Sequence, residues 1–136
     1  MILDIDRFKS INDTYGHQNG DRVISAISQE LRDNLRGADM VSRFGGEEFL
    51  ISMPDTSVEE ATIAANRLRR KVEGLRVGLF EGGYVKATIS VGLTVRTPKK
   101  GSARKNLQDM IRDADAALYS AKSAGRNQVN RINAAA

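Results

Sequence analysis

The chain has 136 residues, a length that fits one domain, and its formal net charge is +4. It contains no cysteine and a single histidine, which excludes disulfide scaffolds, thiolate metal sites, cysteine nucleophiles and three-histidine metal centres. The excess of basic residues favours an anionic partner such as a nucleotide, a nucleic acid or a membrane surface, although acidic residues are interleaved with the basic ones. No apolar run approaches the roughly 18 residues of a membrane span, so we expect a protein of the reducing cytoplasm.

The first half of the chain predicts one strand, two helices and a hairpin. The expected elements are a buried strand over 1–5, a helix over 8–15, a break over 16–20, a helix over 21–35, and strands over 40–44 and 49–53. The longer helix carries apolar residues at steps of three and four between Ile24 and Leu35, as on one helical face. Gly45 and Gly46 separate the two later strands and would supply two positive φ values for a tight hairpin turn.

The second half predicts two helices and two strands. The expected elements are a helix after Ser57, a loop over 78–83, a strand over 87–95, a basic loop over 97–104, a helix from Leu107 that stops at Gly125, an edge strand over 128–132 and a tail over 134–136. Ser57 and Glu60 match a capping box at the start of the first of these helices. The strand over 87–95 alternates apolar and polar residues, which predicts one buried face.

The order of these elements predicts an α+β fold. It reads β-α-α-β-β-α-β-α-β, with the hairpin between two helices. This order is typical of a split β-α-β arrangement, in which helices pack on one face of an antiparallel sheet. We expect residues 1–133 to form one domain, followed by the tail of three alanines.

Two pairs of acidic residues are candidates for metal binding or acid–base chemistry. Asp4 and Asp6 lie at the end of the first strand, and their side chains share a face if the backbone stays extended. Glu47 and Glu48 follow the glycine pair, and strand pairing would bring one of them towards Asp4. Carboxylates that converge repel each other unless a hard cation such as Mg²⁺ lies between them. The alternative is four solvated acids at the ends of turns.

The glycine turn and the end of the last helix are two further candidate sites. Gly45 and Gly46 would let a ligand lie against the backbone, or would serve only to reverse the chain. Lys122 and Arg126 could hydrogen-bond the last carbonyls of the helix, or reach a polyphosphate held at the acidic residues.

Five blocks of sequence together resemble a known family. They are DIDRFKSIND (4–13), YGHQNGD (15–21), RFGGEEF (43–49), SVG (90–92), and DADAALY with AK and GRN (113–127). In this order they resemble the GGDEF-type diguanylate cyclases, in the Gly-Gly-Glu-Glu-Phe form of the signature. The resemblance implies a fold like that of nucleotidyl cyclases and polymerase palm domains, with residues 1–133 as a GGDEF domain.

The resemblance also implies a reaction. Two molecules of GTP would give cyclic di-GMP and two pyrophosphates, as each 3′-hydroxyl attacks the α-phosphate of the other nucleotide. The metal, Mg²⁺ or Mn²⁺, would be held by Asp4, the Ile5 carbonyl and Glu47, and Glu47 or Glu48 would be the catalytic base. Because one chain carries one half-site, catalysis implies a homodimer.

The same motifs imply a set of GTP-binding residues. Asn12 and Asp21 would hydrogen-bond the guanine edge, and an aspartate there would reject adenine. Backbone N–H groups at the start of the helix over 8–15 would cradle phosphates, and Lys122 and Arg126 would neutralise the β- and γ-phosphates. The full implied set is Phe8, Lys9, Asn12, His17, Asp21, Gly45, Gly46, Lys122 and Arg126.

The resemblance also implies a product-binding site, which rests on an Arg-x-x-Asp motif. Arg36 and Asp39 have the spacing of the family's Arg-x-x-Asp motif ahead of Gly45, and Arg67 aligns with a second arginine used by relatives. Cyclic di-GMP bound there would inhibit its own synthesis. Without the family context, an arginine and an aspartate at this spacing are an ordinary surface pair.

The chain departs from the family pattern at its N-terminus. A helix and an Asp-x-Leu-Thr-Gly-Leu-x-Asn-Arg stretch usually precede the first strand, so we expect an N-terminally truncated domain of low intrinsic activity. We also expect a sensor or receiver domain in the parent protein, which could be tethered to a membrane, but no membrane or nucleic-acid contact by this chain.

Three choices stay open in the sequence. His17 either approaches the nucleotide or stabilises its loop. The chain could also be a catalytically silent cyclic di-GMP receptor that uses Arg36, Asp39 and Arg67. A basic nucleic-acid-binding module is a third reading, against which the scarcity of aromatic side chains for base stacking argues.

Overall fold

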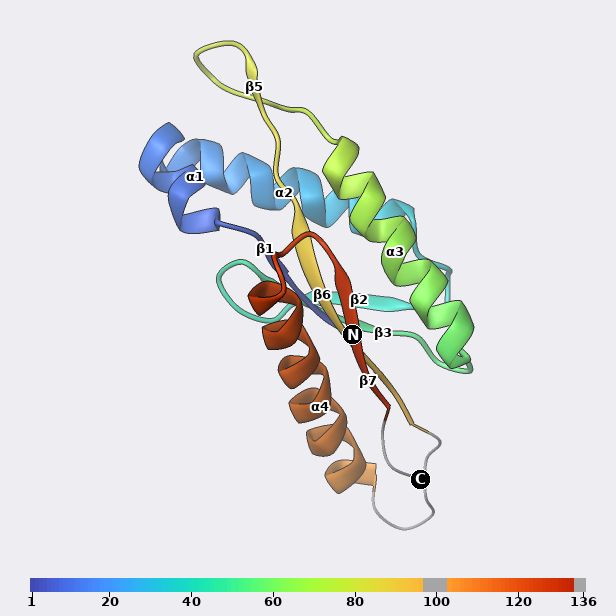
Figure 1. Cartoon of the computed structure of the whole chain (residues 1–136). Helices are drawn as coiled ribbons and strands as arrows, with labels where there is room; N and C mark the ends of the chain where they lie inside the picture. The colour runs from blue at the N-terminus through green and yellow to red at the C-terminus, as the bar shows by residue number, and fades with distance from the viewer. Residues whose placement is uncertain (97–102, 134–136) are drawn as a thin grey trace.

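The computed structural model describes residues 1–96 and 103–133 (Figure 1). Its elements are β1 (Ile2–Ile5), α1 (Phe8–Tyr15), α2 (His17–Asp33), β2 (Met40–Arg43), β3 (Glu48–Ser52), α3 (Val58–Gly74), β4 (Val77–Gly78), β5 (Tyr84–Val85), β6 (Ile89–Val95), α4 (Ala103–Ser123) and β7 (Val129–Asn133). Residues 97–102 of the expected basic loop over 97–104 lie outside the described residues, and α4 begins at 103. The expected tail over 134–136 also lies outside them. Across the described ranges, no helix has the length and apolar character needed to cross a membrane.

The main sheet has five strands in the order β2-β3-β1-β6-β7, with β1 at its centre. As the sequence predicts, β1 neighbours the hairpin, pairing antiparallel with β3, and β2 pairs antiparallel with β3. β1 also pairs antiparallel with β6. β7 is parallel to β6, because α4 carries the chain back along the sheet before β7 begins. The predicted α+β architecture is confirmed, with a sheet that is mixed at this one edge.

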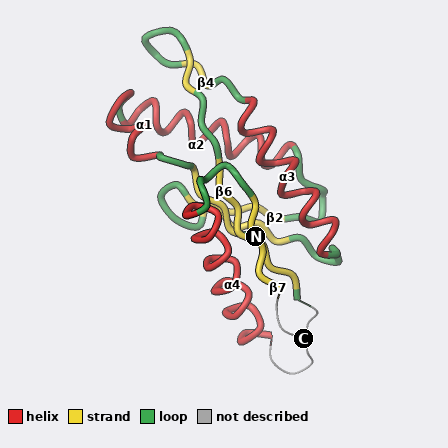
Figure 2. The backbone as a smooth tube through the Cα atoms, viewed as in Figure 1, coloured by secondary structure: helices red, strands yellow, loops and turns green. Residues whose placement is uncertain are grey.

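Helices cover both faces of the sheet, whereas the sequence predicted one covered face (Figure 1 and Figure 2). Leu3 and Ile5 of β1 belong to the large core beneath α1, α2 and α3. Ile2 packs on the opposite face, with Ala114 and Leu118 of α4. All four residues of β1 are buried, since its alternating side chains are covered from both sides.

The polar side of β6 is also buried, contrary to the alternation in its sequence. Ser90 is fully buried and Thr94 is 6% exposed, because α4 crosses this side of the strand. Gly92 lies directly beneath α4, where an added Cβ would come 2.0 Å from the carbonyl oxygen of Ala114. The missing side chain of Gly92 therefore sets how closely α4 approaches the sheet.

Helix α2 begins at His17 rather than at Asp21, so the predicted break over 16–20 is wrong except at its first residue. Gly16, with φ of 82°, alone separates α1 from α2. Gly20 lies inside α2, where an added Cβ would come 1.8 Å from Oδ1 of Asn12. Gly20 thus allows α1 and α2 to pack closely. In the sequence, a glycine that close packing requires looks the same as a glycine that marks a turn.

The β2–β3 hairpin has its predicted place but not its predicted turn. Neither Gly45 nor Gly46 has a positive φ. The N–H groups of Phe44 and Gly45 both donate to the carbonyl oxygen of Glu48, which closes a wider loop. The guanidinium of Arg43 donates to the carbonyl oxygens of Gly45 and Gly46. Hydrogen bonds from a side chain therefore shape this loop in place of left-handed glycines.

The loop expected over 78–83 is the tip of a small hairpin. β4 and β5 pair antiparallel, with Val77 opposite Val85. Gly82 and Gly83 have positive φ values and reverse the chain. In Figure 1 this hairpin projects away from the main sheet.

The predicted capping box at the start of α3 is confirmed. Ser57 Oγ accepts from the N–H of Glu60, and the Glu60 carboxylate accepts from the N–H of Ser57. We expect Ser57→Ala to lower the free energy of unfolding by about 1 kcal/mol, because it removes the acceptor for an N–H of the first helical turn. Denaturation in urea measures the change. Ser25→Ala, at an exposed position of α2, is the control, and equal losses in the two variants would contradict the role of the cap.

Candidate active site

Asp4 lies on the central strand, and the hairpin brings acidic residues to it. The strand register places Asp4 opposite Glu48 of β3 and opposite Ser90 of β6. The N–H of Ile5 donates to the carbonyl oxygen of Glu47 at 3.1 Å, which joins the end of β1 to the glycine loop. Both glutamates are therefore neighbours of Asp4, and the one directly opposite, on the same face, is Glu48.

Lys122, near the end of α4, forms an ion pair with Asp4. Its Nζ lies 2.8 Å from Oδ2 of Asp4, and the Asp4 side chain is 9% exposed. The sequence left open whether this lysine hydrogen-bonds the last carbonyls of its helix or reaches a polyphosphate held at the acidic residues. The structure shows a direct ion pair with Asp4, which places Lys122 at the acidic residues where the polyphosphate was expected.

The electrostatics of Asp4 reflect these neighbours. Burial raises the pKa of Asp4, the hydrogen bond and charge of Lys122 lower it, and the charges of Glu47 and Glu48 raise it further, with a net upward shift. A raised carboxyl pKa means that negative charge at this position is poorly compensated. An additional cation between the carboxylates would stabilise their charged forms.

The atoms of this site suit a hard divalent cation. The side chains of Asp4, Glu47 and Glu48 and the adjacent carbonyls offer only oxygen, which Mg²⁺ and Mn²⁺ prefer. Among the described residues, no three or more His, Cys, Asp or Glu side chains form a group that could hold a metal ion. A cation here would therefore keep water or phosphate ligands, as Mg²⁺ usually does.

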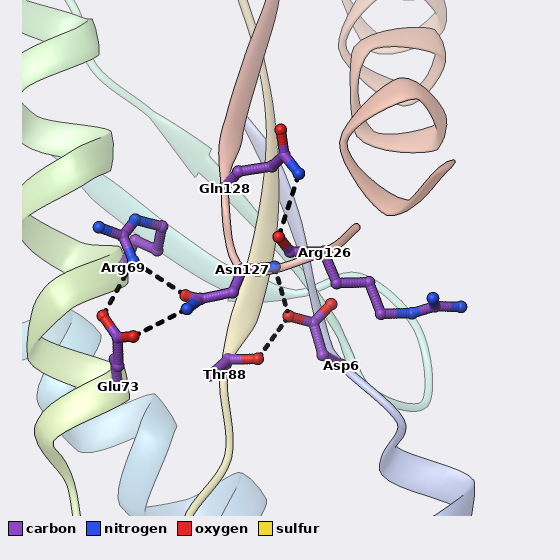
Figure 3. Close-up of polar contacts among 7 residues, drawn as sticks. All are labelled: Asp6, Arg69, Glu73, Thr88, Arg126, Asn127 and Gln128. Atoms are coloured by element: carbon purple, nitrogen blue, oxygen red, sulfur yellow. Dashed lines mark hydrogen bonds and ion pairs between the residues drawn. The ribbon is translucent and has the colours of Figure 1, made fainter. Parts of the chain in front are cut away.

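Asp6 has a different set of partners from Asp4. Its carboxylate accepts hydrogen bonds from Thr88 Oγ1 and the backbone N–H of Asn127 (Figure 3). It also accepts one from Ser90 Oγ. Asp6 thus ties β1 to β6 and to the turn before β7. Sequence reasoning missed Asn127 as a partner, because 121 residues separate it from Asp6 and no local pattern connects them.

The start of α1 presents backbone N–H groups close to the end of β1. Arg7 precedes the helix in the left-handed conformation, with φ of 54°, and no side chain caps the helix. The first-turn N–H groups, among them those of Phe8 and Lys9, favour an anion at this position. A cleft of about 590 Å³ lies beside α1 and is bordered by the turn over 125–127.

The residues implied to read guanine lie at the junction of α1 and α2. Oδ1 of Asn12 is buried and has no hydrogen-bond partner. An unpaired buried oxygen destabilises a protein unless a ligand or water satisfies it. Asp21 and His17 are exposed on α2, and Gly20 brings that helix against Asn12.

The residues of the implied product site surround the loop between α2 and β2. Asp39 Oδ2 accepts from the N–H of Arg36 at 2.9 Å. The Arg36 guanidinium lies 4.0 Å from Oε1 of Glu60 on α3. Arg67, also on α3, donates to the carbonyl oxygen of Asn34 at 2.9 Å. The two arginines and Asp39 therefore share one surface formed by the loop and α3.

Gly45 lies against Glu48, whereas Arg126 lines the cleft beside α1 together with Asp6. A Cβ at Gly45 would come 2.7 Å from Oε2 of Glu48, whereas a Cβ at Gly46 would meet nothing within 4 Å. Gly45 thus leaves room for the Glu48 carboxylate. Arg126 lies in the turn after α4, and Figure 3 shows its side chain pointing away from Arg69 and Glu73.

Comparison with known proteins decides the family. A family model described as diguanylate cyclase, GGDEF domain, matches residues 1–128. The chain belongs to the GGDEF family. This GGDEF chain is 37% identical over 129 residues to diguanylate cyclase DosC of Escherichia coli K12, covering 95% of the chain and 27% of that relative. It is 43% identical over 128 residues to the probable diguanylate cyclase DgcC of the same strain, covering 94% of the chain and 33% of that relative.

Solved GGDEF structures have the same fold. Diguanylate cyclase SiaD of Pseudomonas aeruginosa, in complex with its activator SiaC, matches with a TM-score of 0.86 and 36% identity, over 96% of this chain and 48% of SiaD. The GGDEF domain of DgcB from Caulobacter crescentus, in complex with c-di-GMP, matches with a TM-score of 0.85 and 31% identity, over 96% of this chain and 74% of that one. The GGDEF chain thus corresponds to one part of longer relatives.

Proposed function

We propose that this GGDEF chain is a diguanylate cyclase, which condenses two GTP molecules into cyclic di-GMP and releases two pyrophosphates. The observation that carries the proposal is the Asp4 site, where Asp4 lies opposite Glu48 of the neighbouring strand, pairs with Lys122 and precedes the uncapped start of α1. Nucleotidyl transfer depends on positioning and charge neutralisation more than on covalent catalysis. Relatives named as diguanylate cyclases, aligned over most of this chain, support the same activity.

The acidic residues would hold a divalent cation and accept a proton. Asp4, the Ile5 carbonyl and Glu47 are the proposed ligands of Mg²⁺ or Mn²⁺, which supplies Lewis-acid stabilisation of charge at the α-phosphate. Glu47 or Glu48 takes the proton of the attacking 3′-hydroxyl, and the position of Glu48 opposite Asp4 favours Glu48. The hydroxyl oxygen bonds to the α-phosphorus while the bond from that phosphorus to the bridging oxygen breaks, and pyrophosphate leaves with that oxygen.

Cationic and N–H groups would neutralise the triphosphate. Lys122 already lies at the acidic site, and Arg126 lies in the turn that borders the cleft beside α1. The N–H groups of Phe8 and Lys9 at the helix start would hydrogen-bond phosphate oxygens. The glycine loop at Gly45 would leave space for the nucleotide beside Glu48.

The junction of α1 and α2 would select guanine. The amide of Asn12 can hydrogen-bond the base edge, and the Asp21 carboxylate can accept from the N–H groups that guanine presents. Adenine would leave the carboxylate without these donors, which costs affinity for ATP. His17, exposed at the start of α2, would approach the same nucleotide.

Cyclisation would require two chains. Each GTP supplies one 3′-hydroxyl and one α-phosphate, and one chain carries one half-site. Two half-sites must therefore face each other in a homodimer. At low protein concentration the rate should rise with more than the first power of concentration, and further domains of a longer parent protein would raise it by holding two chains together.

The surface around the α2–β2 loop would bind the product. Arg36, Asp39 and Arg67 lie together there, and guanidinium groups suit phosphate and guanine. We expect Arg36→Ala to weaken inhibition by cyclic di-GMP at least about tenfold while the initial rate stays within about twofold, because Arg36 lies away from the Asp4 site. Initial rates measured against added cyclic di-GMP test this. Arg32→Ala, at an exposed position of α2, is the control, and equal inhibition of the Arg36 variant and the parent would contradict the proposed site.

A second candidate function is a catalytically silent receptor for cyclic di-GMP. The same arginine surface favours it, and the DgcB domain is a relative solved with c-di-GMP. The acidic site distinguishes the two functions, since a receptor has no need of Asp4, Glu47 and Glu48. Calorimetric titration with a non-hydrolysable GTP analogue and Mg²⁺, and separately with cyclic di-GMP, tests the choice. A cyclase binds both ligands and loses only the first with Asp4→Ala, whereas a receptor binds only the second.

A further inference from the structure

The turn over 125–127, which carries Arg126, has a strained backbone. Gly125, Arg126 and Asn127 have φ values of 119°, 66° and 47°. Consecutive left-handed residues of which two are not glycine persist only where their surroundings hold them. The contacts that hold this turn come from residues for which the proposed reaction has no use.

The side chain of Asn127 connects the turn to α3 (Figure 3). Its Oδ1 accepts from Nη1 of Arg69 at 2.9 Å, and its Nδ2 donates to Oε1 of Glu73 at 2.8 Å. Arg69 Nη1 also lies 2.9 Å from Oε2 of Glu73, which closes a ring of three side chains. These hydrogen bonds lower the pKa of Glu73, so the ring favours its charged form.

The backbone of Asn127 connects the same turn to β1. Its N–H donates to Oδ2 of Asp6 at 3.0 Å. Asp6 is itself fixed by the hydroxyl groups of Thr88 and Ser90, each at 2.6 Å. Asp6 is 6% exposed and lies two residues after Asp4 on the same chain. The turn is thus bound to the strand that carries the acidic site and to α3 at once.

We propose that Asn127, held by Arg69 and Glu73 on α3 and by Asp6 at the end of β1, is a positioning residue that fixes Arg126 for the polyphosphate of the substrate. This inference rests on the proposed function of the chain, because it assigns Arg126 to the nucleotide. The guanidinium loses less freedom on binding if its backbone is already fixed at the cleft. The ring needs both ends of the Asn127 amide, one as acceptor and one as donor.

An exchange of carboxylate and amide tests the ring. Asn127→Asp keeps the size of the side chain and the N–H to Asp6, but sets a carboxylate against Glu73. We expect it to weaken binding of a non-hydrolysable GTP analogue with Mg²⁺ about tenfold. Adding Glu73→Gln restores a donor and an acceptor with the parent net charge, and should return affinity to within about threefold of the parent.

A double-mutant cycle tests the route through Arg126. We expect Arg126→Ala to weaken binding of the GTP analogue about tenfold. The double variant Arg126→Ala with Asn127→Asp should bind the analogue within about threefold of Arg126→Ala alone, whereas independent effects would multiply to about a hundredfold loss. Arg69→Gln should also weaken binding, whereas Arg70→Gln, which removes the same charge from the exposed neighbouring position, should not. If Asn127→Asp does not fold, Asn127→Gly replaces it, because glycine keeps the positive φ and removes only the side chain.

The outcomes separate this inference from the proposed function. Rescue by Glu73→Gln shows that Asn127→Asp acts through the ring, and a non-additive cycle supports the positioning role, since a loss of general stability would not depend on Arg126. Multiplying effects in the cycle, or an Asn127 variant within twofold of the parent, would overturn the positioning role alone. A parent chain that binds no GTP analogue would overturn the proposed function, and this inference with it.

Discussion

Asp4→Asn is expected to reduce cyclic di-GMP formation about a thousandfold. The substitution keeps the shape of the side chain but removes the charge that faces Glu48 and pairs with Lys122. A neutral amide is a weak ligand for a hard cation, and loss of such charge stabilisation costs roughly two to three orders of magnitude in rate. Product formation from GTP with Mg²⁺, followed by chromatography, measures the effect.

The matched control for Asp4 is Asp115, an exposed residue of α4. Asp115→Asn removes the same charge away from the site and should leave the rate within about twofold. Unfolding curves for both variants separate a catalytic loss from loss of the fold. Activity of Asp4→Asn within about fivefold of the parent would remove Asp4 from the proposed metal site.

The largest loss of stability is expected from Gly92→Ala. The added Cβ would lie 2.0 Å from the carbonyl oxygen of Ala114 and 2.3 Å from the backbone nitrogen of Leu118. Both atoms belong to the backbone of α4, so the whole helix must move away from β6. We expect the free energy of unfolding to fall by about 3 kcal/mol or more. Because α4 carries Lys122 to Asp4, nucleotide affinity should fall as well.

Gly74, the last residue of α3, is the control for Gly92. A Cβ at Gly74 would meet nothing within 4 Å and its φ is not positive. Gly74→Ala should therefore leave stability unchanged or slightly higher. Urea denaturation of both variants measures the contrast, and a Gly92→Ala loss below about 1 kcal/mol would show that α4 is not held against the sheet at this residue.

The sequence predicted well those features that depend on near neighbours. Helix α1 has its expected bounds, because an apolar spacing and a glycine define them locally. The capping box at Ser57 was predictable for the same reason, since its two members are three residues apart. The hairpin also lies where its glycines and flanking apolar residues indicated.

Features that depend on distant contacts were not predictable from these patterns. The serine and threonine of β6 read as a solvent-facing row, whereas α4 buries them at Ser90 and Thr94. Gly92 in the same row was the signal of a close contact, but a strand glycine does not name its partner. The prediction of positive φ values at Gly45 and Gly46 was wrong, because Arg43 shapes the loop through its own hydrogen bonds.

The candidate site divides in the same way. Asp4, Glu48 and Lys122 were named from motifs in separate blocks, and the structure brings them together. The partners of Asp6 were not named, because the carboxylate is satisfied by residues more than 80 positions away. The candidate reactive residues could thus be named from the sequence, whereas the hydrogen bonds that hold them in place became known only from the structure.

The most direct test of the proposed function is turnover of GTP by the purified chain with Mg²⁺, at rising protein concentration, beside the Glu48→Gln variant. We expect one cyclic di-GMP and two pyrophosphates for every two GTP consumed, a rate that rises faster than the protein concentration, and a loss of about a hundredfold or more in the variant. Contradiction would come from a chain that binds the GTP analogue but forms no cyclic di-GMP with Mg²⁺ or Mn²⁺ at any concentration, or from a Glu48→Gln variant as active as the parent.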